Sequence, residues 1–263
     1  MTPASGSAPG TLTVTASPAG LAAGTYSGSV TVTAAGASGS PKTIPVTFAV
    51  TAAPTGLVAA YGFDEPSGGT VADASGSGNA GTVDGATRTA NGRFGGALSF
   101  DGVNDRVNVP HSASLALTNA MTLEAWVAPD VLGGWRTVLL KERAGGLSYA
   151  LYGSDDQGRP TVYGRAASEV GTTGAAALGL GTWTHIAGTY DGTMLRFYVG
   201  GTQVATRALT GSLTAGTQPL SIGGNSVWGE WFQGRIDEVR VYNRVLSPAD
   251  ITGDMTRAVS GGA

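Results

Sequence analysis

Aromatic side chains in glycine- and serine-rich segments are the residues of this sequence best suited to bind a ligand. Trp228 and Trp231 stand three positions apart in SVWGEWFQG, and Trp135 precedes Arg136 in DVLGGWRTV. An indole offers a flat apolar face that stacks on the C–H face of a sugar ring, and an arginine donates hydrogen bonds to hydroxyl groups. We therefore predict that these four residues contact a ligand. The alternative is that Trp231 closes one end of a core and Trp228 is only a loop residue.

Three tyrosines extend this prediction. Tyr149 and Tyr152 occur in LSYALYG, and Tyr163 occurs in TVYGRA. Both segments are rich in residues that favour strands. Tyrosines on neighbouring strands can line a groove between the two tryptophan-bearing loops, so all three are predicted ligand contacts.

The carboxylates argue against catalysis. A retaining glycosidase needs two carboxyl groups about 5 Å apart, which a strand supplies at alternating positions such as Glu-x-Asp-x-x-Glu. No such run occurs, and the adjacent Asp237 and Glu238 of RIDEVR should point to opposite faces of a strand. Glu124 stands alone, and His185 has no Ser or Cys partner within a recognisable motif. We predict no catalytic residues and no enzyme, with a hydrolase or lyase as the weaker alternative.

Acidic side chains in turns suggest a calcium site. Asp101 and Asp105 occur in FDGVND, Asp64 ends the first expected strand of the larger domain, and Asp237 lies in its last strand. Carboxylate oxygens are calcium ligands, and these four residues are the predicted ones for one structural Ca²⁺. The alternative is that they form turns by accepting hydrogen bonds from nearby backbone amides.

Composition limits the remaining classes of function. The chain has 263 residues, a net charge of -3 and no cysteine, which excludes disulfides and gives no electrostatic footprint for nucleic acid. No apolar run approaches the roughly 18 residues of a membrane span. The start, MTPASGSAPG, lacks the basic and apolar regions of a signal peptide. We expect a secreted or cell-surface protein whose export signal lies outside this chain.

The elements that must position these residues read as short strands. From residue 56 onward, alternating apolar and polar segments are separated by turn residues every eight to twelve positions, which is typical of a sandwich or jelly roll. One helical turn is expected in SPADITGDM, with Ser247 as N-cap and Pro248 at the first helical position. Both parities of TLEAWVAP and TWTHIAGTYDG carry apolar groups, so these strands should be covered on both faces. Trp126, Trp183 and His185 are therefore predicted to be structural.

The first 53 residues differ in pattern. TLTVTAS, GTYSGSVTVTAAG and KTIPVTFAV alternate as three half-buried strands, and AGTYSGSVTVTA with IPVTFAVTAAP resembles the C-terminal half of a bacterial immunoglobulin-like surface repeat. Residues 1–53 are expected to form a partial immunoglobulin-like segment and a linker. Its open strand edges could pair with neighbouring protein chains.

Residues 54–263 resemble a known family. LVAAYGFDE, GRFGGALSFDGVNDRVNVP, MTLEAWVAP, GTWTHIAGTYDG and FQGRIDEVRVYNRVLSPADI, in this order, are similar to the LamG-like jelly rolls of the concanavalin A-like lectin and glucanase superfamily. The resemblance implies an all-β chain built on an antiparallel sandwich, but not one activity, because the fold hosts lectins, adhesion modules, spacers and hydrolases. From the aromatic residues of the loops we predict a non-catalytic, lectin-like module that binds a glycan or polysaccharide, with a protein-binding or architectural module as the alternative. No nucleic-acid partner and no membrane insertion are expected.

Overall fold

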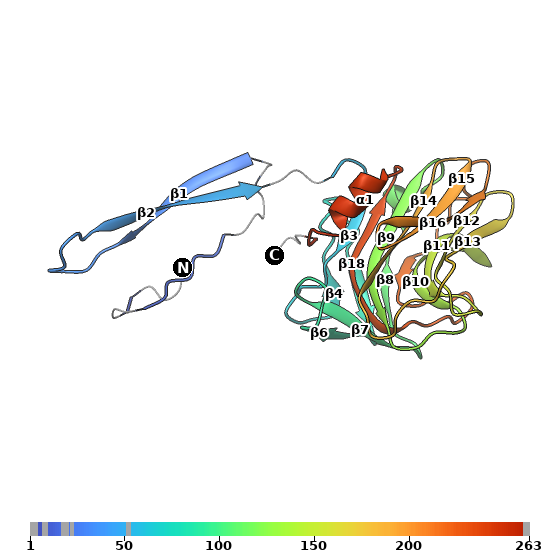
Figure 1. Ribbon diagram of the computed structural model, residues 1–263, viewed down its shortest axis with the longest axis horizontal. Coiled ribbons are helices and arrows are strands. Elements are labelled where there is room, and N and C mark those ends of the chain that lie inside the picture. Colours follow the sequence, from blue (N-terminus) through green and yellow to red (C-terminus); the bar gives the residue numbers. More distant parts are fainter. Residues whose placement is uncertain (1–4, 7–9, 17–20, 22–23, 51–53, 260–263) are drawn as a thin grey trace. The chain divides into compact units, whose positions relative to one another are not determined.

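The computed structural model describes residues 5–6, 10–16, 21, 24–50 and 54–259. By its internal contacts the chain divides into two compact units, Met1–Pro54 with Gly262–Ala263, and Thr55–Gly261. Both units are built from antiparallel strands (Figure 1). The predicted all-β class is confirmed.

The first unit contains one hairpin. β1 (Gly24–Val32) pairs with β2 (Lys42–Val50) along nine residues each. Most side chains on both strands are solvent-exposed, as is usual for a two-stranded ribbon. In the first expected segment, residues 11–16 are described, and Thr13 alone takes part in a β-bridge; residue 17 lies outside the described residues. The immunoglobulin-like origin of this segment stays a prediction.

The second unit is a sandwich of two sheets that face each other across a common core (Figure 1). The first sheet has the strand order β13 (Glu169–Thr173), β12 (Thr161–Arg165), β11 (Gly146–Ser154), β10 (Arg136–Arg143), β17 (Leu220–Ile222), β8 (Arg106–Val109), β5 (Gly81–Asp84) and β4 (Thr70–Val71). The second sheet has the order β16 (Thr202–Ala208), β15 (Met194–Val199), β14 (Thr184–Tyr190), β9 (Met121–Pro129), β18 (Gln233–Tyr242), β7 (Ala97–Asp101) and β6 (Thr87–Thr89), with β3 (Leu57–Tyr61) beside β18.

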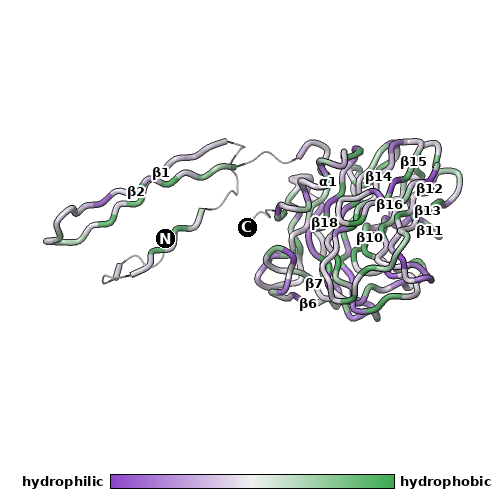
Figure 2. The backbone as a smooth tube through the Cα atoms, viewed as in Figure 1, coloured by the Kyte–Doolittle hydropathy of each residue, from purple (hydrophilic) through white to green (hydrophobic). Residues whose placement is uncertain are grey.

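Strand alternation builds the core. Leu123, Ala125 and Val127 of β9 point into it together with Leu139 and Leu151 of the first sheet. Apolar residues accordingly follow the strands, and many hydrophilic residues lie in the connecting loops (Figure 2). The two sheets pack closely at Gly188 of β14, where a Cβ would lie 2.4 Å from Cγ2 of Val162 on β12.

A short helix covers the outer face of the second sheet. α1 (Pro248–Asp254) begins with the predicted N-cap, because the Ser247 hydroxyl accepts a hydrogen bond from the Asp250 amide in a full capping box. Its Ile251 packs with Tyr242 and Tyr198 on the outward side of the sheet. This cover explains why β9 is buried on both faces, as the apolar residues at both parities predicted.

Four strands were not predicted from the sequence: β4, β5, β6 and β13. They have two to five residues each, too few to show a clear alternation of apolar and polar positions. Pairing with longer neighbours holds them in place, because β13 lies at the sheet edge against β12 and β5 lies between β4 and β8.

Candidate functional site

An aromatic cavity opens on the outward face of the first sheet. Its volume is about 280 Å³. Four aromatic side chains, one aliphatic side chain and two carboxylates line it: Trp135, Tyr152, Tyr163, Trp228, Leu147, Glu169 and Glu230. We call this set the aromatic cavity.

Neighbouring strands place the two tyrosines side by side. Tyr152 of β11 pairs with Thr161, and Tyr163 of β12 pairs with Ala150, so the tyrosines are diagonal neighbours on one face. Their ring centroids lie 5.9 Å apart in an edge-to-face arrangement. Trp135, in the loop before β10, completes a triangle at 5.0 Å from Tyr152 and 5.5 Å from Tyr163. These three rings hold one another in place and form a rigid wall.

The loop between β17 and β18 carries the fourth ring. Trp228 is 45% exposed. Its backbone amide donates a 2.9 Å hydrogen bond to Asn225 Oδ1, and the buried Asn225 donates from Nδ2 to Thr137 Oγ1 and to Glu230 Oε2. The asparagine thus joins the loop to β10 beneath it. Trp228 is presented on a supported loop with its ring open to solvent.

Glu230 is a carboxylate of the aromatic cavity that was not among the predicted ligand contacts. Burial raises its pKa, against the hydrogen bonds from Asn225, Tyr152 and Thr137 that lower it. Within the described part of the chain it forms no ion pair. The only feature of the sequence that could have pointed to Glu230 as a site residue is its place between Trp228 and the strand that begins at Gln233. A loop that folds back over a sheet has no periodic pattern of apolar residues from which its contacts could be predicted.

Glu169 is the second carboxylate of the cavity, and it is differently placed. It lies on β13, a strand that was not predicted. Arg143 and Arg165 approach its Oε1 at 3.7 and 3.5 Å. Its charge is therefore largely balanced, unlike that of Glu230.

The structure brings together four of the seven predicted ligand contacts: Trp135, Tyr152, Tyr163 and Trp228. Tyr149 lies elsewhere, since its hydroxyl donates a 2.9 Å hydrogen bond to the Leu115 carbonyl inside the core. Residues three apart on a strand point to opposite faces, so Tyr149 and Tyr152 cannot share a groove.

The two remaining predicted contacts brace loops. Trp231 bridges to Gly224, where a Cβ would lie 2.1 Å from its ring. Arg136 donates from Nη1 to the Trp231 carbonyl at 3.0 Å and from Nε to the Gly133 carbonyl at 3.2 Å. Neither side chain lines the aromatic cavity.

The predicted calcium ligands fall at the two ends of β7. Asp101 and Asp105 form a tight turn, in which Asp101 Oδ1 accepts from the Val103 amide and Asp105 Oδ2 accepts from the Asp101 amide. Asp64 accepts from the Gly96 amide, five residues from Asp101. At ~3.3 Å per residue these ends lie about 16 Å apart, so all four cannot bind one ion. The turn-forming alternative accounts for every bond of the Asp101–Asp105 pair.

Asp64 and Asp237 both accept hydrogen bonds from backbone amides of the same loop, residues 92–96. Asp237 Oδ2 accepts from the Arg93 and Phe94 amides at 2.8 and 3.1 Å. Burial, with the charge of Glu238, raises the pKa of Asp237 to about 7. Among the described residues, no group of three or more His, Cys, Asp or Glu side chains is arranged to hold a metal ion.

The strand that carries these acids is not regular. β18 has a register shift between Asp237 and Arg240, and Glu238 adopts a φ of 55°. The simple alternation that placed Asp237 and Glu238 on opposite faces therefore does not apply. Both carboxyls are fully buried, and burial raises the pKa of Glu238 to about 7.

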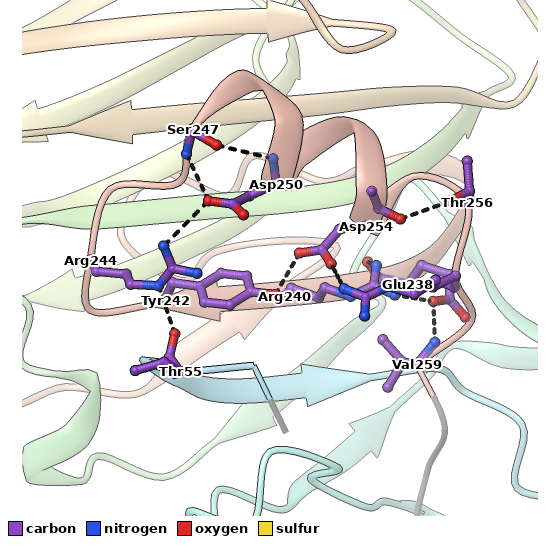
Figure 3. A network of polar contacts seen from close by, with 12 residues as sticks. Thr55, Glu238, Arg240, Tyr242, Arg244, Ser247, Asp250, Asp254, Thr256 and Val259 are labelled. Carbon is purple, nitrogen blue, oxygen red and sulfur yellow. Dashed lines mark hydrogen bonds and ion pairs between the residues drawn. The ribbon is translucent and has the colours of Figure 1, made fainter. Parts of the chain in front are cut away.

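A polar network joins β18 to α1 and the C-terminal segment (Figure 3). Arg240 pairs with Glu238 at 2.9 Å, and the Tyr242 hydroxyl donates to Asp254 at 2.5 Å. Glu124 and His185 are buried near this network; burial raises the pKa of Glu124 and lowers that of His185 to about 3. The network is enclosed beneath the helix, consistent with the structural role predicted for His185.

The predicted structural tryptophans are likewise packed. Trp126 is 7% exposed, with the Arg93 guanidinium 4.4 Å from its ring centroid. The Arg235 guanidinium covers the ring of Trp183 at 5.3 Å.

Within the described residues, no helix is both long and apolar enough to cross a membrane.

Comparison with known proteins identifies relatives of this sandwich. The family described as the concanavalin A-like lectin/glucanases superfamily matches residues 101–252. Mouse pappalysin-1 is 27% identical in an alignment 179 residues long that covers 60% of this chain and 11% of that protein. The chain therefore spans about a tenth of that relative.

Solved structures share the fold. Domain 4 of AbnA, a GH43 extracellular arabinanase from Geobacillus stearothermophilus in complex with arabinotriose, has a TM-score of 0.63 and 20% identity over 76% of this chain and 98% of that chain. Trypanosoma rangeli sialidase in complex with sialic acid has a TM-score of 0.61 and 21% identity over 79% of this chain and 34% of that chain. At these identities the likeness establishes the fold alone.

Proposed function

The chain belongs to the concanavalin A-like lectin/glucanase superfamily, and on this premise we propose that it is a non-catalytic carbohydrate-binding module of a larger secreted or cell-surface protein. The proposed ligand is a glycan or polysaccharide, and the proposed binding site is the aromatic cavity. Trp228 is the principal stacking platform, and Trp135, Tyr152 and Tyr163 form the wall beside it.

One observation carries this proposal: four aromatic rings converge at an open cavity that is outside the core. Buried aromatic residues usually serve the core, but these rings pack on the outward face of a sheet, and Trp228 is 45% exposed. An exposed indole beside ordered rings presents apolar area at little entropic cost, which suits the C–H face of a sugar. The cavity, about 280 Å³ in volume, is small for a ligand pocket, which favours one sugar unit or a chain end.

The relatives support this class of ligand. Domain 4 of the arabinanase was solved with arabinotriose, and 76% of the present chain covers nearly all of that domain. A domain of this fold can therefore accompany a glycan-degrading enzyme and hold an oligosaccharide. The extracellular setting of that arabinanase is the reason to propose a secreted or surface location here.

A hydrolase remains the second candidate because Glu169 and Glu230 line the same cavity. Glycosidases divide acid and base roles between two carboxyls in different environments, and these two carboxyls differ in burial and pairing. The binding role is favoured because two arginines engage Glu169. Release of reducing sugar by wild type but not by Glu230→Gln would favour the hydrolase.

A protein-contact role is the third candidate, through the β1–β2 hairpin. Within the described residues neither outer edge of this two-stranded sheet pairs with another strand. Such an edge can accept a strand from a neighbouring chain. Concentration-dependent association that the Thr55–Gly261 unit alone does not show would support it.

We extend the proposal to one structural calcium ion at Asp64 and Asp237, completed by backbone carbonyl oxygens. Carboxyl groups gather in this neighbourhood: the charge of Asp64 helps raise the pKa of Glu238. Although Glu238 Oε2 pairs with Arg240, its Oε1 is buried without a partner in the described part of the chain. Calcium should raise the Tm relative to chelator, and Asp237→Asn should abolish that rise. An equal Tm with and without calcium would remove the ion from the proposal.

The experiment for the main proposal is affinity electrophoresis in gels that contain one soluble polysaccharide each. Retardation of wild type by a polymer, lost in a Trp135→Ala, Trp228→Ala variant, would support it. Trp183→Ala is the matched control, because Trp183 lies at the second sheet, outside the cavity. Unchanged migration of wild type on every polymer would contradict it.

A further inference from the structure

The aromatic cavity has an unbalanced charge. Two carboxylates line it, and no cationic side chain does. Asp156 adds a third negative group at the rim, because its Oδ2 accepts a 3.0 Å hydrogen bond from the Trp135 indole nitrogen. The nearby arginines are already paired: Arg143 and Arg165 balance the charge of Glu169, and Arg159 approaches Asp155.

Of the three carboxylates at the aromatic cavity and its rim, Glu230 and Asp156 form no ion pair with any described residue, whereas Glu169 does. Each is hydrogen-bonded only by neutral groups: Asn225 for Glu230 and the Trp135 indole for Asp156. Each carboxylate therefore contacts an aromatic wall and lacks a counter-charge. A half-buried carboxylate in this setting gains most from a cation that arrives with the ligand.

The aromatic rings favour the same kind of ligand. The faces of Trp and Tyr attract cations through the ring quadrupole, most strongly where water is displaced. Four such rings beside two uncompensated carboxylates form a site for a positive charge on an otherwise apolar surface. A uronic acid or another anionic sugar would instead place like charges together, which is unfavourable.

From this arrangement we propose that the aromatic cavity selects glycans that carry a protonated amine, such as a polymer of glucosamine, over neutral and anionic glycans. This inference rests on the proposed function, since the glycan is what stacks on Trp228. Glu230 and Asp156 receive the ammonium group, and the sugar ring lies against Trp228. Glu230 is thereby a specificity-determining residue rather than a catalytic one.

The test compares three tetrasaccharides of matched length: glucosamine, N-acetylglucosamine and glucose oligomers. Binding is followed by calorimetry at a pH where the amine is protonated. We expect the glucosamine oligomer to bind about tenfold more tightly than the glucose oligomer. Raising the salt concentration should reduce that preference and leave the weaker neutral binding unchanged.

Two variants separate the inference from the proposed function. Glu230→Gln keeps the size of the side chain and one acceptor oxygen for Asn225 but removes the charge, so it should abolish the preference while glucose oligomers still bind. Asp84→Asn, on β5 outside the cavity, removes one negative charge as the matched control and should retain the preference.

Equal binding of all three oligomers, or a preference that survives Glu230→Gln, would overturn the inference and leave the carbohydrate-binding role intact. Failure of every oligomer to bind would overturn both. An acetylated oligomer that binds as tightly as the glucosamine oligomer would also overturn the inference, because acetylation removes the charge.

Discussion

Trp135 and Tyr152 lie edge to face with their ring centroids 5.0 Å apart, one in a loop and the other on β11. This contact joins a loop tip to the outward face of the first sheet. Because Tyr163 also contacts the Trp135 ring, two ring contacts hold the loop to the sheet, in addition to the hydrogen bonds of Arg136 with the Gly133 carbonyl and of Trp135 with Asp156. A preordered wall of this kind loses little freedom when a ligand binds.

Removing the Trp228 ring should weaken sugar binding strongly without affecting the fold. Trp228→Ala is expected to weaken sugar binding at least tenfold and to change the free energy of unfolding by less than about 0.5 kcal/mol, because the ring is half-exposed and outside the core. Calorimetry and urea unfolding measure the two effects. A destabilised variant, or one that binds as wild type does, would show that Trp228 serves the fold instead.

Tyr149 and Tyr152 should respond in opposite ways to loss of the hydroxyl group. Tyr149→Phe removes the donor to the Leu115 carbonyl and should cost about 1 kcal/mol of stability with ligand affinity unchanged. Tyr152→Phe removes a hydrogen bond to Glu230, so it should alter ligand affinity. Parallel unfolding and binding measurements check the pair. If Tyr149→Phe bound the ligand more weakly while its free energy of unfolding matched that of wild type, Tyr149 would be a ligand contact after all.

The sequence predicted most of the long strands and the capped helix, because each has its own period or its own capping residues. Ser247 and Pro248, for example, act within a few residues of where they stand. The candidate site was predicted in part for the same reason: aromatic residues in polar segments stand out individually. Glu169 and Glu230 did not stand out, because their role depends on β13 and on a loop that returns over the sheet, both fixed by tertiary pairing. The bulge at Glu238 is likewise set by the pairing of β18 with both β9 and β3.

Asp237 should make stability depend on pH. Its pKa is raised from 3.8 to about 7 in the folded state, so its contribution to stability is full below about pH 4 and is lost as the pH rises through 7. Between pH 5 and pH 8 wild type should therefore lose stability relative to Asp237→Asn, on the order of 1–3 kcal/mol.

The comparison with the variant is needed because His185 acts in the opposite direction. Its pKa is lowered to about 3, so its contribution is lost as the pH falls below 6.5, and this effect is common to both proteins. Urea unfolding at several pH values, in the presence of chelator, gives the difference directly. A difference that is constant between pH 5 and pH 8 would mean that Asp237 is ionised normally in the folded state.

Two glycines test how closely the sheets pack. A Cβ at Gly188 would lie 2.4 Å from Val162 Cγ2 across the core, so Gly188→Ala should cost about 1–3 kcal/mol through overpacking. At Gly253, in α1, a Cβ would meet nothing within 4 Å, and Gly253→Ala should be neutral or stabilising by up to about 1 kcal/mol, since alanine favours helices. Both variants add the same methyl group. A difference in their free energies of unfolding, measured by chemical denaturation, therefore reports the room available at each position and its backbone conformation, and not the chemical change itself. If Gly188→Ala were as stable as Gly253→Ala, the sheets would have to move apart easily at β14 and β12, and the rigid support of Tyr163 on the opposite face of β12 would be lost with it.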